Sequence, residues 1–227
     1  MSNNEKYLKT IRISLVINII VFFLATISSI MMFTGVRFMD GNDSILESTK
    51  IGMLKFFTVE SNMFVGIISL LFAIQEIQIV KGKRKEFGVL LYILKLMATT
   101  AVGLTFFVVF AYLGPISEGG IPSMLMNSNL FFHLIIPVLS IINFILFERT
   151  NRIKFKYSFF GVIPALVYGF FYLINILIHM ENGKVSTIYD WYWFVQDGVW
   201  TAIIVVPLIL LITYIISLIL WRLNKIL

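Results

Sequence analysis

Two short polar segments inside long apolar runs hold the residues of this sequence whose types and spacing suit chemistry. The first contains Thr58, Ser61 and Asn62, which stand at i, i+3 and i+4 and share one face of a helix. The second contains Asn129 and His133, again at i and i+4, so the amide can reach the edge of the imidazole. An unpaired polar group in hydrocarbon costs several kcal/mol, so each of these side chains needs a partner or a function.

These residue types fit nucleophilic acyl chemistry. A threonine hydroxyl such as that of Thr58 is a weak nucleophile until a base removes its proton, and His133 is the side chain suited to that near neutral pH. Asn129 can hold the imidazole in the required tautomer, and Ser61 or Asn62 can donate to a developing oxyanion. The alternative is structural, with the same side chains forming hydrogen bonds between packed helices.

The composition places these residues in a membrane protein. The chain has 227 residues, of which 59% are hydrophobic and 13% charged, and its mean hydropathy is +0.94. A soluble domain of this length cannot hide so much apolar surface and still present a charged exterior to water. We therefore expect an all-α, polytopic fold in which residues 1–227 form a single bundle of six transmembrane helices.

Six apolar runs are long enough to cross about 30 Å of hydrocarbon at 1.5 Å per residue. They are Ile11–Phe33, Phe56–Val80, Phe87–Leu113, Leu130–Phe147, Ser158–Met180 and Val199–Trp221. Prolines inside the later runs, at 137, 164 and 207, predict kinks that neighbouring helices can accommodate. The candidate residues lie in the first turns of the second and fourth runs.

The basic residues of the loops predict the orientation. The tails and the loops on their side of the membrane would carry 13 Lys and Arg, and the opposite loops 4. Under the positive-inside rule, both termini are then cytoplasmic, and the net charge of +6 reflects contact with anionic lipid and not with nucleic acid. We expect an integral protein of the plasma membrane.

This orientation brings the two polar segments to one depth. The second and fourth spans both run from outside to inside, so Thr58, Asn62, Asn129 and His133 should all lie near the outer leaflet. The sequence thus predicts a hydroxyl, an imidazole and two amides at the same level of the membrane.

Several kinds of site are excluded or weakly supported. The chain has no cysteine, which excludes disulfides and thiolate ligands, and its two histidines cannot form a three-histidine metal site. We expect no metal and no organic cofactor. The sequence Asn42-Asp43-Ser44 matches a glycosylation pattern on the outer side, although so short a pattern carries little weight.

Three further polar residues lie within or near the spans. Glu76 and Lys95 fall in the inner parts of their runs and are expected to form a buried ion pair, with a structural role favoured over a proton or ion pathway. His179 lies beside Glu181 at the outer end of the fifth run and can line the same pocket as His133, but an interfacial histidine needs no function.

The two polar segments resemble those of a known family. Phe56-Phe57-Thr58-Val59-Glu60-Ser61-Asn62 followed by Asn129-Leu-Phe-Phe-His133-Leu-Ile-Ile-Pro137 is similar to the androgen-induced protein family, and most of all to its six-helix bacterial relatives. The eukaryotic members are membrane-embedded threonine hydrolases that cleave fatty acid esters of hydroxy fatty acids. The resemblance implies that Thr58 is the nucleophile and His133 the base.

One segment departs from the pattern of the bacterial relatives. These often carry a Tyr-Pro-Tyr-Pro-like segment before the last span, where this chain has Tyr189-Asp190-Trp191-Tyr192-Trp193-Phe194. If that loop shapes the substrate entrance, the identity of the substrate does not transfer from the family to this chain.

These observations together predict an intramembrane hydrolase of lipid esters. Thr58 and His133 would be catalytic, Asn129 would orient the imidazole, and Ser61 and Asn62 would line the site. The substrate would be a membrane lipid that enters laterally from the outer leaflet. Two other functions remain open: a small transporter or channel subunit that uses Glu76, Lys95 and Thr99-Thr100, and a lipid-binding or sensory protein without catalysis.

Overall fold

The computed structural model describes residues 3–39, 48–117, 119–195 and 199–226. It confirms the expected fold class, since the described chain contains six helices long and apolar enough to cross a membrane. The chain is thus an integral membrane protein built from α-helices. The candidate glycosylation sequence Asn42-Asp43-Ser44 lies outside the described residues.

Short breaks divide several of the spans. The helices are α1 (Asn3–Thr34), α2 (Phe57–Val80), α3 (Val89–Val108), α4 (Gly114–Ile116), α5 (Gly120–Ser123), α6 (Ser128–Leu130), α7 (Ile136–Leu146), α8 (Ile163–Ile178) and α9 (Val199–Ile226). The third span joins α3 to α4, the fourth joins α6 to α7, and a 3-10 helix at Phe155–Val162 leads into α8.

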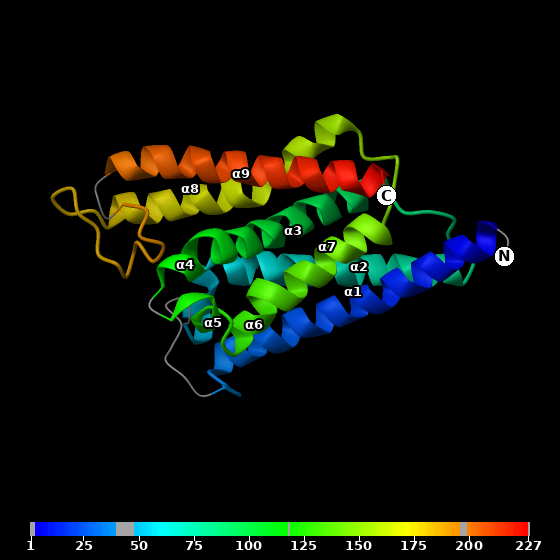
Figure 1. The fold of residues 1–227 in the computed structure, drawn as a ribbon, viewed down its shortest axis with the longest axis horizontal. Helices are drawn as coiled ribbons and strands as arrows, with labels where there is room; N and C mark the ends of the chain where they lie inside the picture. Colours follow the sequence, from blue (N-terminus) through cyan, green and yellow to red (C-terminus); the bar gives the residue numbers. More distant parts are fainter. Residues whose placement is uncertain (1–2, 40–47, 118, 196–198, 227) are drawn as a thin grey trace.

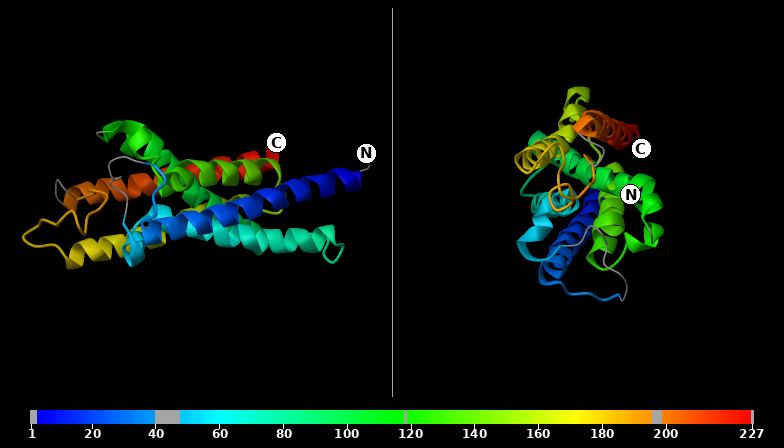
Figure 2. Two further views of the ribbon diagram at one scale, coloured as in Figure 1. Left: turned by 90° about the horizontal axis from the view of Figure 1, so that it is seen from below. Right: turned by 90° about the vertical axis from the view of Figure 1, so that its left-hand side faces the viewer.

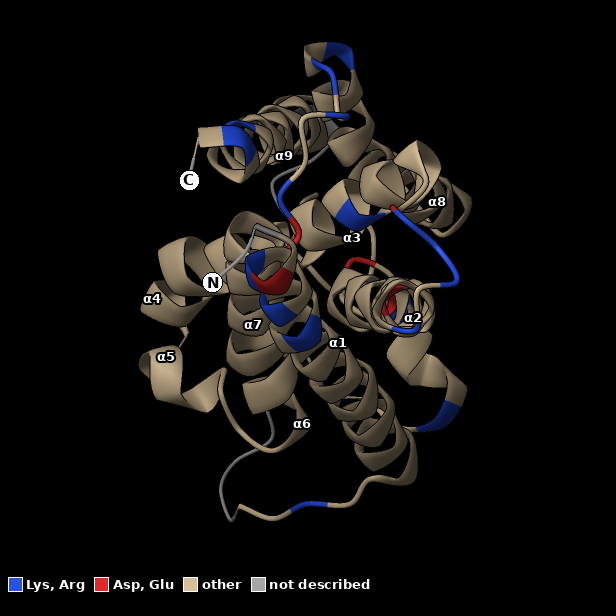
Figure 3. Ribbon diagram, turned by 90° about the vertical axis from the view of Figure 1, so that its right-hand side faces the viewer, with Lys and Arg blue, Asp and Glu red and all other residues tan. Residues whose placement is uncertain are grey.

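The spans form an elongated bundle with α3 at its centre. In α3 and its continuation, 67% of the most apolar stretch is buried, against 17% in α9. Figure 3 looks along the bundle and shows α3 between α2, α7, α8 and α9, which all contact it. The outward side chains of α8 and α9 are large and apolar, as expected for helices that face lipid.

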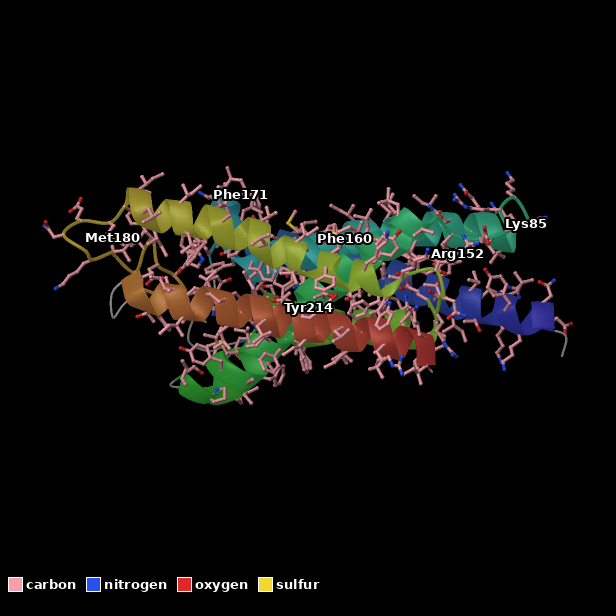
Figure 4. The ribbon with its side chains drawn as sticks, turned by 90° about the horizontal axis from the view of Figure 1, so that it is seen from above. Lys85, Arg152, Phe160, Phe171, Met180 and Tyr214 are labelled. Atoms are coloured by element: carbon pink, nitrogen blue, oxygen red, sulfur yellow. The ribbon has the colours of Figure 1, made fainter. Side chains whose placement is uncertain are left out.

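Both termini lie at one end of the bundle, as an even number of spans requires (Figures 1 and 2). Lys85 and Arg152, on two of the basic loops, lie at that same end, whereas Met180 lies at the other (Figure 4). The loop before α9 and the short helices α4 to α6 also lie at the end away from the termini. The polar segments of α2 and the fourth span therefore start from the same end of the bundle.

Two π-helical turns break the third and fourth spans, each just before a proline. They are Val109–Leu113, followed by Gly114-Pro115, and Phe131–Ile135, followed by Ile136-Pro137. In the second, the N–H of Ile136 donates to Phe131 instead of Phe132. Because Pro137 has no N–H, the carbonyl of Phe132 is left without a partner in its own helix.

Helices α1 and α2 pack closely at a small residue. A Cβ atom added to Gly66 of α2 would lie 2.7 Å from the Cβ of Ala25 on α1. Carbon atoms do not approach so closely, so a glycine is needed for the two backbones to come together there. Gly169 of α8 is the opposite case, since a Cβ added to it would meet nothing within 4 Å.

We therefore expect Gly66→Ala to destabilise the bundle and Gly169→Ala to leave it unchanged or slightly more stable. The first change overpacks a contact between helices, which typically costs about 1–3 kcal/mol. The second replaces an unconstrained helical glycine by a better helix former. Melting temperatures of the two variants in one detergent check this, and equal melting temperatures would contradict the close approach of α1 and α2.

Candidate active site

The structure places the candidate residues at the expected end of the bundle. Thr58, Ser61 and Asn62 lie in the first two turns of α2, Asn129 lies in α6, and His133 lies in the following π-helical turn. All five side chains are buried. The two polar segments face each other across the interface between α2 and the fourth span.

Asn62 joins the two segments directly. Its Nδ2 atom donates to the carbonyl of Thr58 at 2.7 Å and to the carbonyl of Phe132 at 3.1 Å. The second bond satisfies the carbonyl that Pro137 leaves free. Both hydrogens of the amide are then in use, so Asn62 has no N–H left for an oxyanion in this structure, contrary to the role expected for it.

His133 presents one free nitrogen. Its Nδ1 atom lies 2.6 Å from the carbonyl oxygen of Met124, and because a carbonyl only accepts, Nδ1 carries the proton of the neutral ring. Nε2 then holds a lone pair, and it has no hydrogen-bond partner among the residues that the structure describes. A neutral imidazole with this tautomer fixed and Nε2 free has the form of a general base.

Asn129 does not hold the imidazole as expected. Neither its amide oxygen nor its amide nitrogen has a hydrogen-bond partner in the described part of the chain, and Met124 orients His133 instead. The expectation assumed a regular α-helix between the two residues. The π-helical turn at 131–135 changes that register, so positions i and i+4 no longer face each other as they would in an α-helix.

Thr58 meets a tyrosine from a distant loop. The hydroxyl of Tyr192 accepts a hydrogen bond from the N–H of Phe57 at 2.9 Å and lies near the side chain of Thr58. Burial raises the pKa of Tyr192 to about 12, against the smaller lowering effect of its polar neighbours Tyr168, Phe57 and Thr58. Tyr192 therefore stays protonated near neutral pH. No hydrogen bond joins Thr58 to Nε2 of His133, since that nitrogen has none to any described residue.

Asp190 holds the loop that carries Tyr192. Its two carboxylate oxygens accept hydrogen bonds from the N–H groups of Phe194 and Val195, both at 2.9 Å, and from the hydroxyl of Tyr172. Its side chain is almost completely buried. This anchor fixes the aromatic loop over the start of α2. From the sequence, Tyr192 was noted only within the segment that departs from the family pattern, although the single acid inside that aromatic segment was a signal.

A cavity of about 520 Å³ adjoins the site at Ser61. It lies between α2, α3 and α8, with mainly apolar walls that include Phe64 and Phe171. Lys55 and Glu60 are the charged residues that line it. The hydroxyl of Ser61 also donates a hydrogen bond to the carbonyl of Thr58 at 3.1 Å. The wall of the cavity thus joins the helical turn that carries Thr58. An apolar chamber with a few polar groups suits an amphipathic molecule.

Comparisons of the chain with the sequence patterns of protein families, with curated protein sequences and with solved structures find no match.

Lys95 forms a buried ion pair, but its partner is Glu148 and not Glu76 as expected. Nζ of Lys95 lies 3.0 Å from Oε1 of Glu148, and no ion pair joins it to Glu76 among the described residues. Glu76 belongs to the same group through Asn18, whose Nδ2 lies 3.1 Å from its Oε2. Glu148 follows the fourth apolar run directly, so the sequence placed it in a loop, although its side chain is only 2% exposed.

His179 takes no part in the candidate site. Its ring stacks on that of Tyr189 with centroids 3.6 Å apart, and its Nδ1 lies 2.8 Å from the carbonyl of Asn175. It does not line the cavity beside Ser61. Its contacts are those of a helix-terminal residue packed on a loop.

Proposed function

We propose that the protein is an intramembrane lipid ester hydrolase in which Thr58 is the nucleophile and His133 the general base. The observation that carries the proposal is the free Nε2 lone pair of a buried, neutral imidazole, in a segment whose Phe132 carbonyl is hydrogen-bonded to Asn62, one turn beyond Thr58. The resemblance of the two segments to the androgen-induced protein family supports the same assignment. Fatty acid esters of hydroxy fatty acids, or similar lipids, are the substrates this implies.

In the proposed reaction, Oγ1 of Thr58 attacks the ester carbonyl carbon while Nε2 of His133 takes its proton. The imidazolium then returns that proton to the leaving alcohol, and an acyl ester on Thr58 remains. Water, deprotonated by the same nitrogen, releases the fatty acid and restores the hydroxyl. No metal or cofactor is required.

The proposal includes a movement of Thr58. Its side chain makes no hydrogen bond to Nε2 of His133 in the free protein and must turn toward it when substrate binds. Catalytic hydrogen bonds often form only in the substrate complex, so the separation of the pair here does not argue against it. Because Asn62 has no free N–H, we assign the oxyanion donor to the hydroxyl of Tyr192, which remains protonated near neutral pH.

The cavity supports a lipid as the substrate. Its apolar walls suit an acyl chain, and Lys55 and Glu60 are the groups that would contact a polar head. In the proposed plasma membrane, the positive-inside pattern supports an orientation with this end at the outer leaflet, from which a lipid would enter between the helices.

The orientation has its own test. With both termini cytoplasmic, cysteines introduced at Asn3 and Asn224 should resist an impermeant thiol reagent in intact cells, whereas one at Asn182 should react. The chain has no native cysteine, so each variant reports on a single position. Reaction at either terminus would reverse the orientation and move the site to the inner leaflet.

One observation favours a second candidate function. The buried group of Glu76, Lys95 and Glu148 is of the kind found along ion pathways in transporters. A fluorophosphonate probe separates the two functions in purified protein. Covalent labelling at Thr58 supports the hydrolase, whereas uptake of a labelled solute into vesicles without labelling at Thr58 supports the transporter.

A further inference from the structure

A group of charged and amide side chains lies buried far from the candidate active site. Its charged members are Glu76 on α2, Lys95 on α3 and Glu148 just after α7, each at most 2% exposed. Glu76 lies five helical turns beyond Thr58, about 27 Å along α2 and toward the end that carries the termini. The group is therefore separate from Thr58 and makes no direct contact with the proposed hydrolysis site.

One amide nitrogen holds the two carboxylates together. Nδ2 of Asn18, on α1, lies 3.1 Å from Oε2 of Glu76 and 2.8 Å from Oε1 of Glu148. Nζ of Lys95 lies 3.0 Å from that same oxygen of Glu148, 2.6 Å from Oδ1 of Asn18 and 3.0 Å from the hydroxyl of Ser69. The group thus ties together four spans.

The charges of the group do not balance if both carboxyls are ionised. Two carboxylates face a single ammonium, that of Lys95. The other titratable groups around them leave the sum unchanged: Tyr7 of α1 and Tyr92 of α3 are neutral, while Arg152 and Glu86 form an exposed pair with each other. One negative charge would remain without a counter-charge in a low-dielectric interior, which is a costly arrangement.

Some buried oxygens of the group also lack a hydrogen-bond donor. Oε1 of Glu76, Oε2 of Glu148 and Oδ1 of Asn143 are buried and have no partner among the described residues. All three are acceptors. The three N–H bonds of Lys95 already have three acceptors, and one N–H of Asn143 donates to Glu148 at 2.9 Å. The hydroxyl of Ser14 also lies beside Glu76.

We propose that Glu76 is a binding site for one exchangeable proton. Glu148 is the carboxylate that pairs with Lys95, so Glu76 is the acid without a counter-charge. A proton on Glu76 cancels the excess charge and converts one acceptor of the group into an O–H donor. A single proton therefore corrects both the charge and the hydrogen bonding. Its uptake or loss would change the charge and the hydrogen bonds at the point where α1, α2, α3 and α7 meet.

Infrared spectroscopy of the full-length protein in an ester-free and carboxyl-free detergent tests the site. At neutral pH the wild-type spectrum should contain the C=O stretch of a buried carboxylic acid, shifted in D₂O. The difference spectrum against Glu76→Gln should show the loss of that band. Glu148→Gln should also remove it, because Glu76 is then needed as the counter-charge of Lys95. The exposed Glu86→Gln is the matched control and should leave the band unchanged.

Glutamine has the shape and charge of protonated glutamate, so Glu76→Gln should fold and melt like the wild type. A misfolded Glu76→Gln protein would overturn the proposal, as would a band that survives in both glutamine variants. A spectrum that shows the acid band only when sodium is replaced by choline would assign the site to a metal cation instead of a proton.

Discussion

Thr58→Ala is expected to abolish ester hydrolysis and labelling by a fluorophosphonate while leaving the melting temperature nearly unchanged. The change removes the attacking oxygen, and the loss of a nucleophile typically lowers kcat by about 10⁴-fold or more. Thr58→Ser keeps the hydroxyl and should retain measurable activity, reduced because the rotamer preference set by the β-methyl is lost. The assay needs purified protein in detergent and a panel of lipid esters.

The chain offers a matched control for this change. Thr213 is also buried in a helix, and its hydroxyl bonds to the carbonyl of Ile209 on its own helix, α9. Thr213→Ala removes the same atoms outside the candidate site and should preserve activity. Full activity in Thr58→Ala would end the threonine-hydrolase proposal.

Variants of the residues around Thr58 make the prediction of a threonine hydrolase more specific. His133→Ala should be about as inactive as Thr58→Ala, and the double variant no worse than either, because the two act as a unit. Tyr192→Phe should lower kcat by about 10²- to 10³-fold if its hydroxyl stabilises the oxyanion. Asn129→Ala should change activity little, since the carbonyl of Met124 orients the imidazole. Losses that multiply in the Thr58–His133 double variant would instead indicate independent roles.

Lys95→Met is expected to have the largest effect on stability. It removes the only cation of the buried group and leaves Glu148 without its counter-charge, and breaking a buried pair in this way typically costs about 3–5 kcal/mol. Replacing the acid as well, in Lys95→Met with Glu148→Gln, should recover much of the loss. Melting temperature and yield in one detergent measure both effects.

The exposed pair of Arg152 and Glu86 is the comparison for the buried one. Neither side chain is shielded from water, so Glu86→Gln should change the melting temperature little. If Lys95→Met melted like Glu86→Gln, the buried pair would not contribute to stability. If the double variant were less stable than Lys95→Met alone, Glu148 would not be the partner that matters.

The membrane fold was predictable from the sequence because it depends on a property summed over many residues. Each span is a run of about 20 apolar residues, and errors at the ends do not change the number of runs. The first run shows the limit of this reasoning, since α1 begins at Asn3, well before the apolar residues that start at Ile11. Charged and polar turns can continue a helix beyond the hydrocarbon.

The candidate site was predictable only in part. The sequence identified two polar segments at one end of the bundle, and the structure brings them together through Asn62. The predicted partner of His133, Asn129, was wrong because the prediction assumed a regular α-helix across residues 129–133. Tyr192 was missed because it reaches Phe57 from 135 residues away in the chain, and no local spacing records such a contact.

The π-helical turn at Phe131–Ile135 makes the position of His133 sensitive to chain length. Such a turn contains one residue more than the α-helical turn it replaces. A chain shorter by one residue here can close the turn as a regular α-helix. Because the π-helical turn adds a residue without adding a turn, the parts of the span on either side would keep their orientation, and only the residues within the turn, His133 among them, would move. A deletion in a regular α-helical part of the span would instead rotate all residues before it by about 100° relative to those after it. The effect of losing one residue therefore depends on where in this span it is lost.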